Sequence, residues 1–151
     1  MKKIFDTSSL LLTEDLFDSN DEIIIPSIVL EELEKIKTAV NKDEDIKYSA
    51  RQLLHFLDKN SDKFICSIYN SLMESYIYKA NLELNNDSRI LACACFIRDS
   101  FPKEEIVFYT NDLAMKEIAK NFFNLKTQSV ELKKDDYYGY VDLYLSEEEM
   151  A

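Results

Sequence analysis

Short continuous runs of apolar residues alternate along the chain with stretches in which apolar residues recur every three or four positions. The runs predict buried strands and the recurring pattern predicts amphipathic helices. The predicted strands are residues 3–5, 22–26, 104–112 and 125–132. The predicted helices are residues 10–17, with Thr13 as N-cap, 27–40, with Ser27 as N-cap, 48–59, 85–101 and 112–123. Strands that alternate with helices in this way indicate a three-layer α/β/α fold with a mainly parallel central sheet.

Two parts of the chain are less well determined by this pattern. Residues 63–69 and 74–80 fit either two strands of a hairpin or a strand followed by a helix. The C-terminal residues 133–151 are acidic and rich in tyrosine, and they are interpreted as a tail or as the start of a linker. We therefore expect one domain over residues 1–132, which is long enough to bury a substantial core.

Composition narrows the function classes. The 151 residues include 18 Lys and Arg against 29 Asp and Glu, a net charge of −11, which disfavours the broad basic surface of a nonspecific nucleic-acid binder. An enzyme that holds phosphates through divalent cations stays compatible with this charge, since such ions reverse the local field. The apolar runs are too short to span a membrane and no leader pattern precedes the first strand, so a cytoplasmic protein without membrane contact is expected. Three cysteines without CxxC spacing are expected to be buried small side chains rather than disulfides or zinc ligands.

Four regions of the chain place a carboxylate near one predicted edge of the sheet. Asp6 and Asp112 follow predicted strands, whereas Glu31 or Glu32 and Asp87 lie near the starts of predicted helices. Singly, three of these regions have an ordinary explanation as helix caps or first-turn acids. Asp6 is harder to explain, because no long helix clearly begins after it. Functional groups in open α/β sheets collect beyond the carboxyl ends of the strands, so the acids together predict a cation site. Oxygen ligands without His or Cys favour Mg²⁺ or Mn²⁺ over zinc.

The stretches that carry these acids resemble, in order and setting, the four acidic motifs of PIN domains. They read "IFDTSSLL", "IIIPSIVLEELEKIK", "NNDSRILACA" and "VFYTNDLAMKEIAK". The sequences of these motifs are most similar to those of the PIN domain at the N-terminus of PhoH-like proteins, in which an ATPase half follows. The likeness extends over about residues 3–124, and no GxxxxGK[ST] loop of such an ATPase occurs in the 151 residues.

The resemblance implies a metal-dependent endoribonuclease with Mg²⁺ or Mn²⁺ as cofactor and RNA, most readily single-stranded, as substrate. The implied catalytic acids are Asp6, Glu32 (with Glu31 as the less favoured choice), Asp87 and Asp112. Asp6, Asp87 and Asp112 would hold the metal, with Thr7, Ser8, Thr110 and Asn111 in support. Ser8 stands where many members have Asn. Lys35, Lys37 and Arg89 are candidates for phosphate contacts, and a role as solvated helix residues is equally consistent with their positions.

Three other readings stay open at this point. The chain could be a PIN-fold module that binds RNA or protein with weak or lost catalysis, or a VapC-type toxin ribonuclease with a small antitoxin partner. A phosphotransfer enzyme of the haloacid dehalogenase type would need a second Asp two residues after Asp6, where the chain has Ser8. A homodimer and an ATPase half C-terminal to this chain are further partners that the resemblance suggests.

Overall fold

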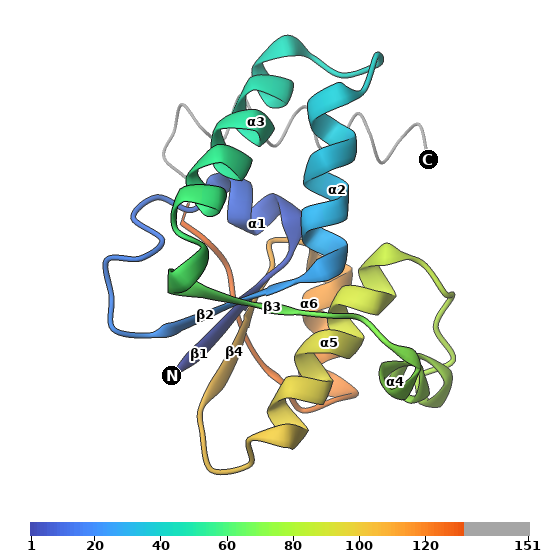
Figure 1. Ribbon diagram of the computed structural model, residues 1–151. Coiled ribbons are helices and arrows are strands. Elements are labelled where there is room, and N and C mark those ends of the chain that lie inside the picture. The colour runs from blue at the N-terminus through green and yellow to red at the C-terminus, as the bar shows by residue number, and fades with distance from the viewer. Residues whose placement is uncertain (132–151) are drawn as a thin grey trace.

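The central sheet contains five strands that are all parallel, in the order β3-β2-β1-β4-β5 (Figure 1). The computed structural model describes residues 1–131. The strands are β1 (Lys2–Phe5), β2 (Glu22–Pro26), β3 (Phe64–Ser67), β4 (Ile106–Tyr109) and β5 (Lys126–Gln128). The chain starts at the centre with β1, moves outward to β2 and β3, and then returns to the other side of β1. This reversal leaves β1 and β4 as neighbours whose connections leave in opposite directions.

The helices form two layers that cover the two faces of the sheet. They are α1 (Thr7–Leu12), α2 (Ser27–Thr38), α3 (Glu44–Lys59), α4 (Glu74–Lys79), α5 (Asn86–Ser100) and α6 (Leu113–Asn121), with 3-10 helices η1 (Ser61–Lys63) and η2 (Ser71–Met73). Helices α1, α2 and α3 pack together on one face, and α5 and α6 lie on the other (Figure 1). Right-handed crossovers require this arrangement once the strand order reverses direction at β1. The predicted three-layer α/β fold is confirmed.

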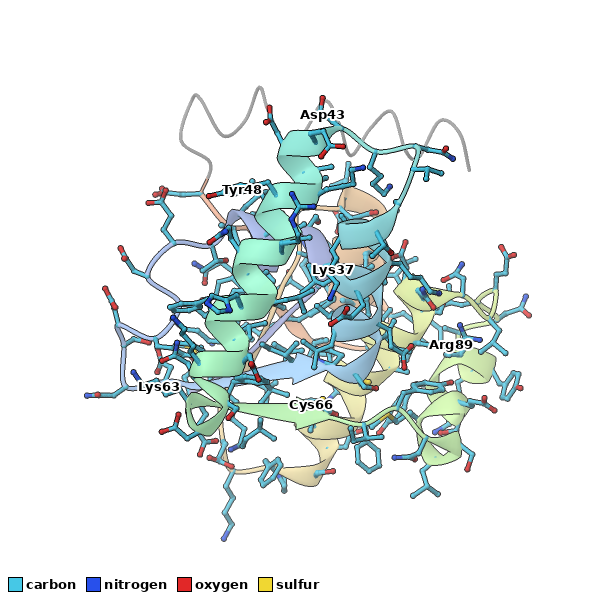
Figure 2. The ribbon with its side chains drawn as sticks, turned by 45° about the horizontal axis from the view of Figure 1, so that its top comes forward. Lys37, Asp43, Tyr48, Lys63, Cys66 and Arg89 are labelled. Atoms are coloured by element: carbon cyan, nitrogen blue, oxygen red, sulfur yellow. The ribbon has the colours of Figure 1, made fainter. Side chains whose placement is uncertain are left out.

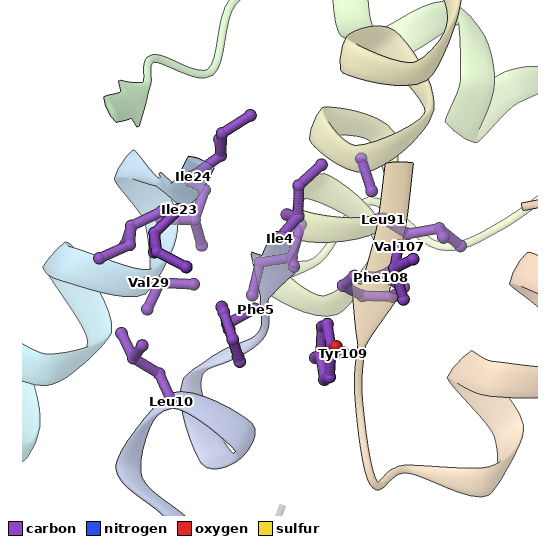
Figure 3. Packing of buried hydrophobic residues seen from close by; sticks show 14 of the residues in the cluster. Ile4, Phe5, Leu10, Ile23, Ile24, Val29, Leu91, Val107, Phe108 and Tyr109 are labelled. Carbon is purple, nitrogen blue, oxygen red and sulfur yellow. The ribbon is translucent and has the colours of Figure 1, made fainter. Parts of the chain in front are cut away.

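The core lies between the sheet and both helix layers (Figure 3). Every residue of β4 is buried, as a central parallel strand with helices on both faces requires. Phe5 and Tyr109 are register partners on β1 and β4, and their rings stack with centroids 4.7 Å apart. This packing fixes the carboxyl ends of β1 and β4 side by side.

Two predicted N-caps are wrong, and the helix predicted over residues 48–59 begins earlier, as α3 at Glu44 with Asp43 as its N-cap. Helix α1 begins at Thr7 with Asp6 as its N-cap, and Thr13 is its C-cap rather than the start of a helix. Ser27 is the first residue of α2 and makes no cap hydrogen bond there, because its hydroxyl oxygen accepts the Tyr69 backbone N–H at 3.0 Å. Both errors have one cause: an oxygen-bearing side chain before an apolar run signals a cap equally well in several registers, and tertiary packing chooses among them.

The middle of the chain follows the second of its two predicted alternatives, a strand followed by a helix, as β3 and α4. Cys93 and Cys95 are buried and unpaired, and burial raises the pKa of each thiol to about 12. Cys66 is half-buried and also unpaired. Within residues 1–131, none of the helices has the length and apolarity that a membrane span requires. The predicted tail, residues 133–151, lies outside the described residues.

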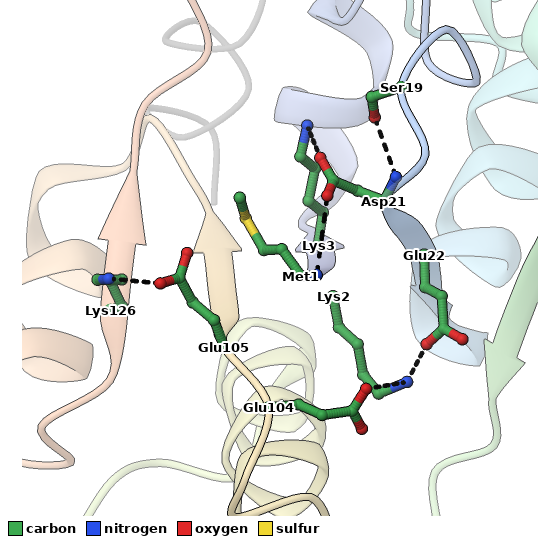
Figure 4. Close-up of polar contacts among 9 residues, drawn as sticks. All are labelled: Met1, Lys2, Lys3, Ser19, Asp21, Glu22, Glu104, Glu105 and Lys126. Atoms are coloured by element: carbon green, nitrogen blue, oxygen red, sulfur yellow. Dashed lines mark hydrogen bonds and ion pairs between the residues drawn. The ribbon is translucent and has the colours of Figure 1, made fainter.

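A set of ion pairs ties the amino-terminal edge of the sheet together, opposite the edge at which the strands end (Figure 4). Lys2 is buried and pairs with Glu22 and, at 3.5 Å, with Glu104. Its ammonium group also lies 4.5 Å from the ring centroid of Phe101. Lys2 therefore links β1 to β2 and to the segment that precedes β4.

We expect Lys2→Ala to lower the free energy of unfolding by about 1–2 kcal/mol, because it removes the hydrogen bond to Glu22, the ion pair with Glu104 and the packed methylene stem. Lys2→Met keeps the apolar volume, and we expect it to stay within about 0.5 kcal/mol of the wild type, since both partner glutamates can be hydrated at the surface. Urea unfolding followed by circular dichroism measures both. Equal losses for the two variants would show that the charge, not the stem, stabilises this edge.

Candidate active site

In open α/β sheets, ligands bind beyond the carboxyl ends of two neighbouring strands whose following connections run to opposite sides of the sheet. In this sheet those two strands are β1 and β4. Asp6 directly follows β1, and residues 110–112 directly follow β4. The Asp6 backbone N–H donates to the Tyr109 carbonyl at 3.1 Å, which continues the strand pairing one residue further. Because of this bond, Asp6 lies beside Thr110.

Asp6 is a buried carboxylate with an exposed fraction of 3%. One of its oxygens accepts the Ser9 backbone N–H at 2.8 Å, which caps α1. Burial raises the pKa of Asp6, and the nearby charge of Asp112 raises it further, while hydrogen bonds from the Thr110 side chain and the Ser9 backbone oppose the shift. No long helix was expected directly after Asp6, and the helix that begins there, α1, is six residues long. The cap contributes one hydrogen bond, yet burial still dominates, so a cation would stabilise the ionised side chain.

Asp112 lies three residues after the end of β4. It caps α6 by accepting the Met115 backbone N–H at 3.0 Å. Its own backbone N–H donates to the hydroxyl oxygen of Thr110 at 3.1 Å. Thr110 is fully buried and interacts with both acids, so its hydroxyl links the ends of the two strands. Asp6 and Asp112 are thus both helix N-caps. For Asp112 this is the ordinary explanation that its sequence position allowed, whereas for Asp6 it was not expected.

Glu32 reaches the same region from α2. The Thr7 hydroxyl donates to a carboxylate oxygen of Glu32 at 2.6 Å, a short and well-formed hydrogen bond. Glu31 is exposed, whereas Glu32 is half-buried. Thr7 therefore orients Glu32 rather than Asp6, the acid beside it in sequence. Ser8 lies 3.4 Å from Asp6, too far for a strong O–H···O bond, so its support of Asp6 is weak.

Asp87 lies in the first turn of α5 and is exposed. The N-cap of that helix is Asn85, whose side-chain oxygen accepts the Ser88 backbone N–H at 2.9 Å. Asp87 is therefore not the cap that its sequence position allowed. Asp87 and Asp112 line one open pocket of about 240 Å³ between α5 and α6. The sheet edge and this pocket meet at Asp112.

The remaining predicted site residues have contacts of their own. The Asn111 side chain accepts the Val130 backbone N–H at 2.8 Å and donates to the Val130 carbonyl at 3.3 Å. These two bonds attach the segment after β5 to the end of β4. Lys37 forms an ion pair with Glu34 at 2.7 Å.

The three candidates for phosphate contacts, Lys35, Lys37 and Arg89, do not line the pocket that holds Asp87 and Asp112. Lys37 instead faces the groove between α2 and α3 (Figure 2). Lys35 is exposed. Arg89 donates to Asn86 at 3.1 Å and lies 5.8 Å from the ring centroid of Tyr69.

The donor set suits a hard divalent cation, because every acid offers only oxygen. Within residues 1–131, no three Asp, Glu, His or Cys side chains are grouped closely enough to hold a metal ion by themselves. Mg²⁺ is commonly held by one or two carboxylates and keeps several water ligands, so such a group is not a requirement. Asp6 and Asp112 are the pair whose charges interact across β1 and β4.

Sequence reasoning missed two contributions to this region. Ser9 provides the backbone N–H that holds Asp6, and residues 82–85 form one wall of the pocket beside Asp112. The predicted range 85–101 already places the start of α5 within one residue. An Asn three residues before Ser88 is a detectable N-cap pattern, and it would have identified Asn85 rather than Asp87 as the cap.

Comparison with known families identifies the class of protein. The family model described as "PIN domain" matches residues 3–131. The chain therefore belongs to the PIN domain family. Among curated proteins, no sequence matches the chain.

Solved structures share the fold at low sequence identity. A chain of VapBC2 from Rickettsia felis, bound to a DNA fragment from its promoter, has a TM-score of 0.58 at 19% identity, covering 87% of this chain and 100% of that one. A domain of a functionally unknown protein from Methanocaldococcus jannaschii gives 0.57 at 21% identity, covering 88% and 93%. VapBC-5 from Mycobacterium tuberculosis, of the VapBC family of toxin–antitoxin systems, gives 0.55 at 13% identity, covering 87% and 98%.

Proposed function

We propose that the protein is an Mg²⁺- or Mn²⁺-dependent endoribonuclease that hydrolyses RNA phosphodiester bonds at the carboxyl ends of β1 and β4. Family membership supports this proposal, because PIN domains are typically nucleases. The observation that carries it is that Thr110, which is fully buried, links buried Asp6 to Asp112 at the point where the strand order reverses. No purely structural role needs two interacting carboxylates at that place, since a neutral Asn or Ser caps a helix equally well.

Each acid has a distinct part in the proposal. Asp6 and Asp112 would hold the ion at the sheet edge and Asp87 would complete its shell from across the pocket. When bound, the ion supplies positive charge that attracts the phosphodiester and stabilises the charged transition state. Glu32, which accepts a hydrogen bond from Thr7, would orient a water molecule or take its proton. Thr110 and the Ser9 N–H keep the Asp6 oxygens in one orientation.

A second candidate is a toxin ribonuclease of the VapC type, which is favoured by the likeness to chains of VapBC structures. In that case a small antitoxin protein would be a partner of this chain. The chemistry would be the same, so the two candidates differ in partner and not in the site. The homodimer, the ATPase half of PhoH type and the cytoplasmic location remain predictions from the sequence.

Removal of divalent metal tests the proposed chemistry. We expect the wild-type protein, treated with EDTA and dialysed, to cleave a fluorescent single-stranded RNA at no more than background rate, and Mn²⁺ or Mg²⁺ to restore cleavage by roughly a hundredfold or more. Gel analysis of end-labelled RNA should show internal cuts.

The Asp6→Asn variant, purified in the same way as the wild type, controls for contaminating ribonuclease. Cleavage that persists in EDTA, or that is the same in that variant, would contradict the mechanism. Metal-independent RNA binding without cleavage by the wild type would favour the module with lost catalysis.

A further inference from the structure

The pocket between α5 and α6 has a lining that the proposed metal site does not fully use. Its floor is apolar, with Leu91 and Met115 buried and Leu82 and Ile118 half-buried. Its rim is polar and acidic, with Glu83, Asn85, Asp87 and Asp112. Among residues 1–131, neither Lys nor Arg lines it. Where no cation is bound, such an acidic rim repels phosphate, so we place the phosphodiester at the sheet edge beside the ion and not on the apolar floor of this pocket.

The pocket is held open by bonds that do not depend on a ligand. The Ser88 hydroxyl donates to the Glu83 carbonyl at 2.6 Å, and Asn85 caps α5. The Leu82 N–H donates to the Ile77 carbonyl at 3.0 Å, directly after Asn81, which adopts a positive φ of 55°. The wall formed by residues 82–85 is therefore fixed at both ends, as a pre-formed binding site requires.

We propose that this pocket binds a single guanine base of the RNA, next to the phosphodiester that is cleaved, with Glu83 as the residue that recognises it. The proposal rests on the proposed ribonuclease function. A volume of about 240 Å³ lies below the range of roughly 300–1,000 Å³ for drug-sized ligands, and suits one flat ring system. Apolar walls with a few polar groups at the rim are how proteins hold a base that has left its stack.

The charge of the rim selects among the bases. A carboxylate only accepts hydrogen bonds, and its two oxygens can accept two at once from neighbouring donors. On its Watson–Crick edge guanine presents two adjacent donors, the ring N1–H and the amino group on C2. Adenine presents a donor beside an acceptor there, and the acceptor would face the carboxylate. Glu83 is exposed at the rim of the pocket, so it can meet that edge without the cost of a buried charge.

Asp112 joins this pocket to the sheet edge, because it lines the pocket and interacts with Asp6. A base in the pocket would therefore have its own phosphate beside the carboxylates and their bound cation. We expect cleavage next to guanine in single-stranded RNA. Exposed Glu83 would then determine specificity without touching the reacting phosphate.

The test is a titration of the ¹⁵N-labelled full chain with GMP, IMP and AMP, followed by amide chemical shifts. IMP lacks the amino group on C2 and keeps everything else. We expect GMP to shift the amides of residues 82–88 and 114–118, with an affinity roughly tenfold or more above that of IMP and AMP. Glu83→Gln should remove this preference, because an amide offers one acceptor and adds donors that clash with those of guanine. Glu117→Gln is the matched control on α6, where Glu117 is exposed and accepts a hydrogen bond from Asn121.

Equal affinity for the three nucleotides, shifts confined to other residues, or a preference that survives in Glu83→Gln would overturn the proposal. Free arginine is titrated in parallel, since a guanidinium also presents flat N–H donors. A stronger response to arginine than to GMP at these residues would also overturn it and indicate a protein side chain as the occupant. The titration needs no cleavage, so GMP binding without metal-dependent RNA cleavage would refute the ribonuclease and leave the guanine site standing.

Discussion

Asp6→Asn is expected to reduce metal-dependent RNA cleavage by roughly a hundredfold or more, while the protein stays folded. The substitution removes the negative charge that a cation needs and keeps the size of the side chain. It also keeps an oxygen that can accept the Ser9 N–H, and Asn caps helices as well as Asp does. Loss of activity in this variant therefore reports on charge and not on the helix start. Cleavage rates at several Mn²⁺ concentrations and a thermal melt provide the two measurements.

Asp62→Asn is the control for that experiment. Asp62 lies in η1, is exposed, and precedes β3, so it is at the amino-terminal edge of the sheet and away from the site. We expect it to cleave RNA like the wild type. Were Asp6→Asn to cleave at the wild-type rate with an unchanged Mn²⁺ dependence, Asp6 could not be a ligand of the catalytic ion. A melt lowered by more than about 10 °C would instead indicate that Asp6 matters for folding.

Phe108→Ala is expected to have the largest effect on stability, a loss of about 3–5 kcal/mol in the free energy of unfolding. Phe108 is fully buried in the middle of β4, between Val107 and Tyr109 (Figure 3). The truncation leaves a cavity at the strand that pairs with both β1 and β5. For a chain of this size the melting temperature should fall by roughly 10 °C. Urea unfolding gives the free energy directly.

Phe122→Ala makes the same chemical change at a position that is 57% exposed. Phe122 contacts Phe123 edge-to-face with ring centroids 4.9 Å apart, so we expect a loss of about 1 kcal/mol. The difference between the two variants isolates the effect of burial. Similar losses for both would mean that the centre of β4 packs less tightly than its burial implies.

The candidate site shows how far the sequence can lead. Asp6 and Asp112 were identified because each follows an apolar run that could only be a buried strand. Their order along the chain fits the family, and the structure places their charges close enough to interact. Which of Glu31 and Glu32 faces the region was ambiguous, because neighbouring helix positions differ by about 100° and the start of α2 was not known to one residue. The Thr7 hydrogen bond gives Glu32 a defined orientation.

Several contacts depend on residues that are far apart in the sequence. Three hydrogen-bonded pairs each join two segments that are distant in sequence: Thr7 with Glu32, Ser27 with Tyr69, and Asn111 with Val130. No local pattern encodes such pairs, because they follow from the strand order and from side-chain packing. The same reason explains the pocket beside Asp112: its wall is the connection between α4 and α5, whose position only the packing of those helices determines.

By itself the sequence determined the α/β class, the parallel sheet and the two acids at the strand ends, because buried strands and amphipathic helices leave periodic patterns in the chain. The tertiary structure alone decided which hydroxyl orients which acid, that Asp6 caps a helix, and that residues 82–85 and α6 enclose a pocket. Those features arise where elements distant in sequence meet, and the free energy of burying both surfaces selects the arrangement in which they do so.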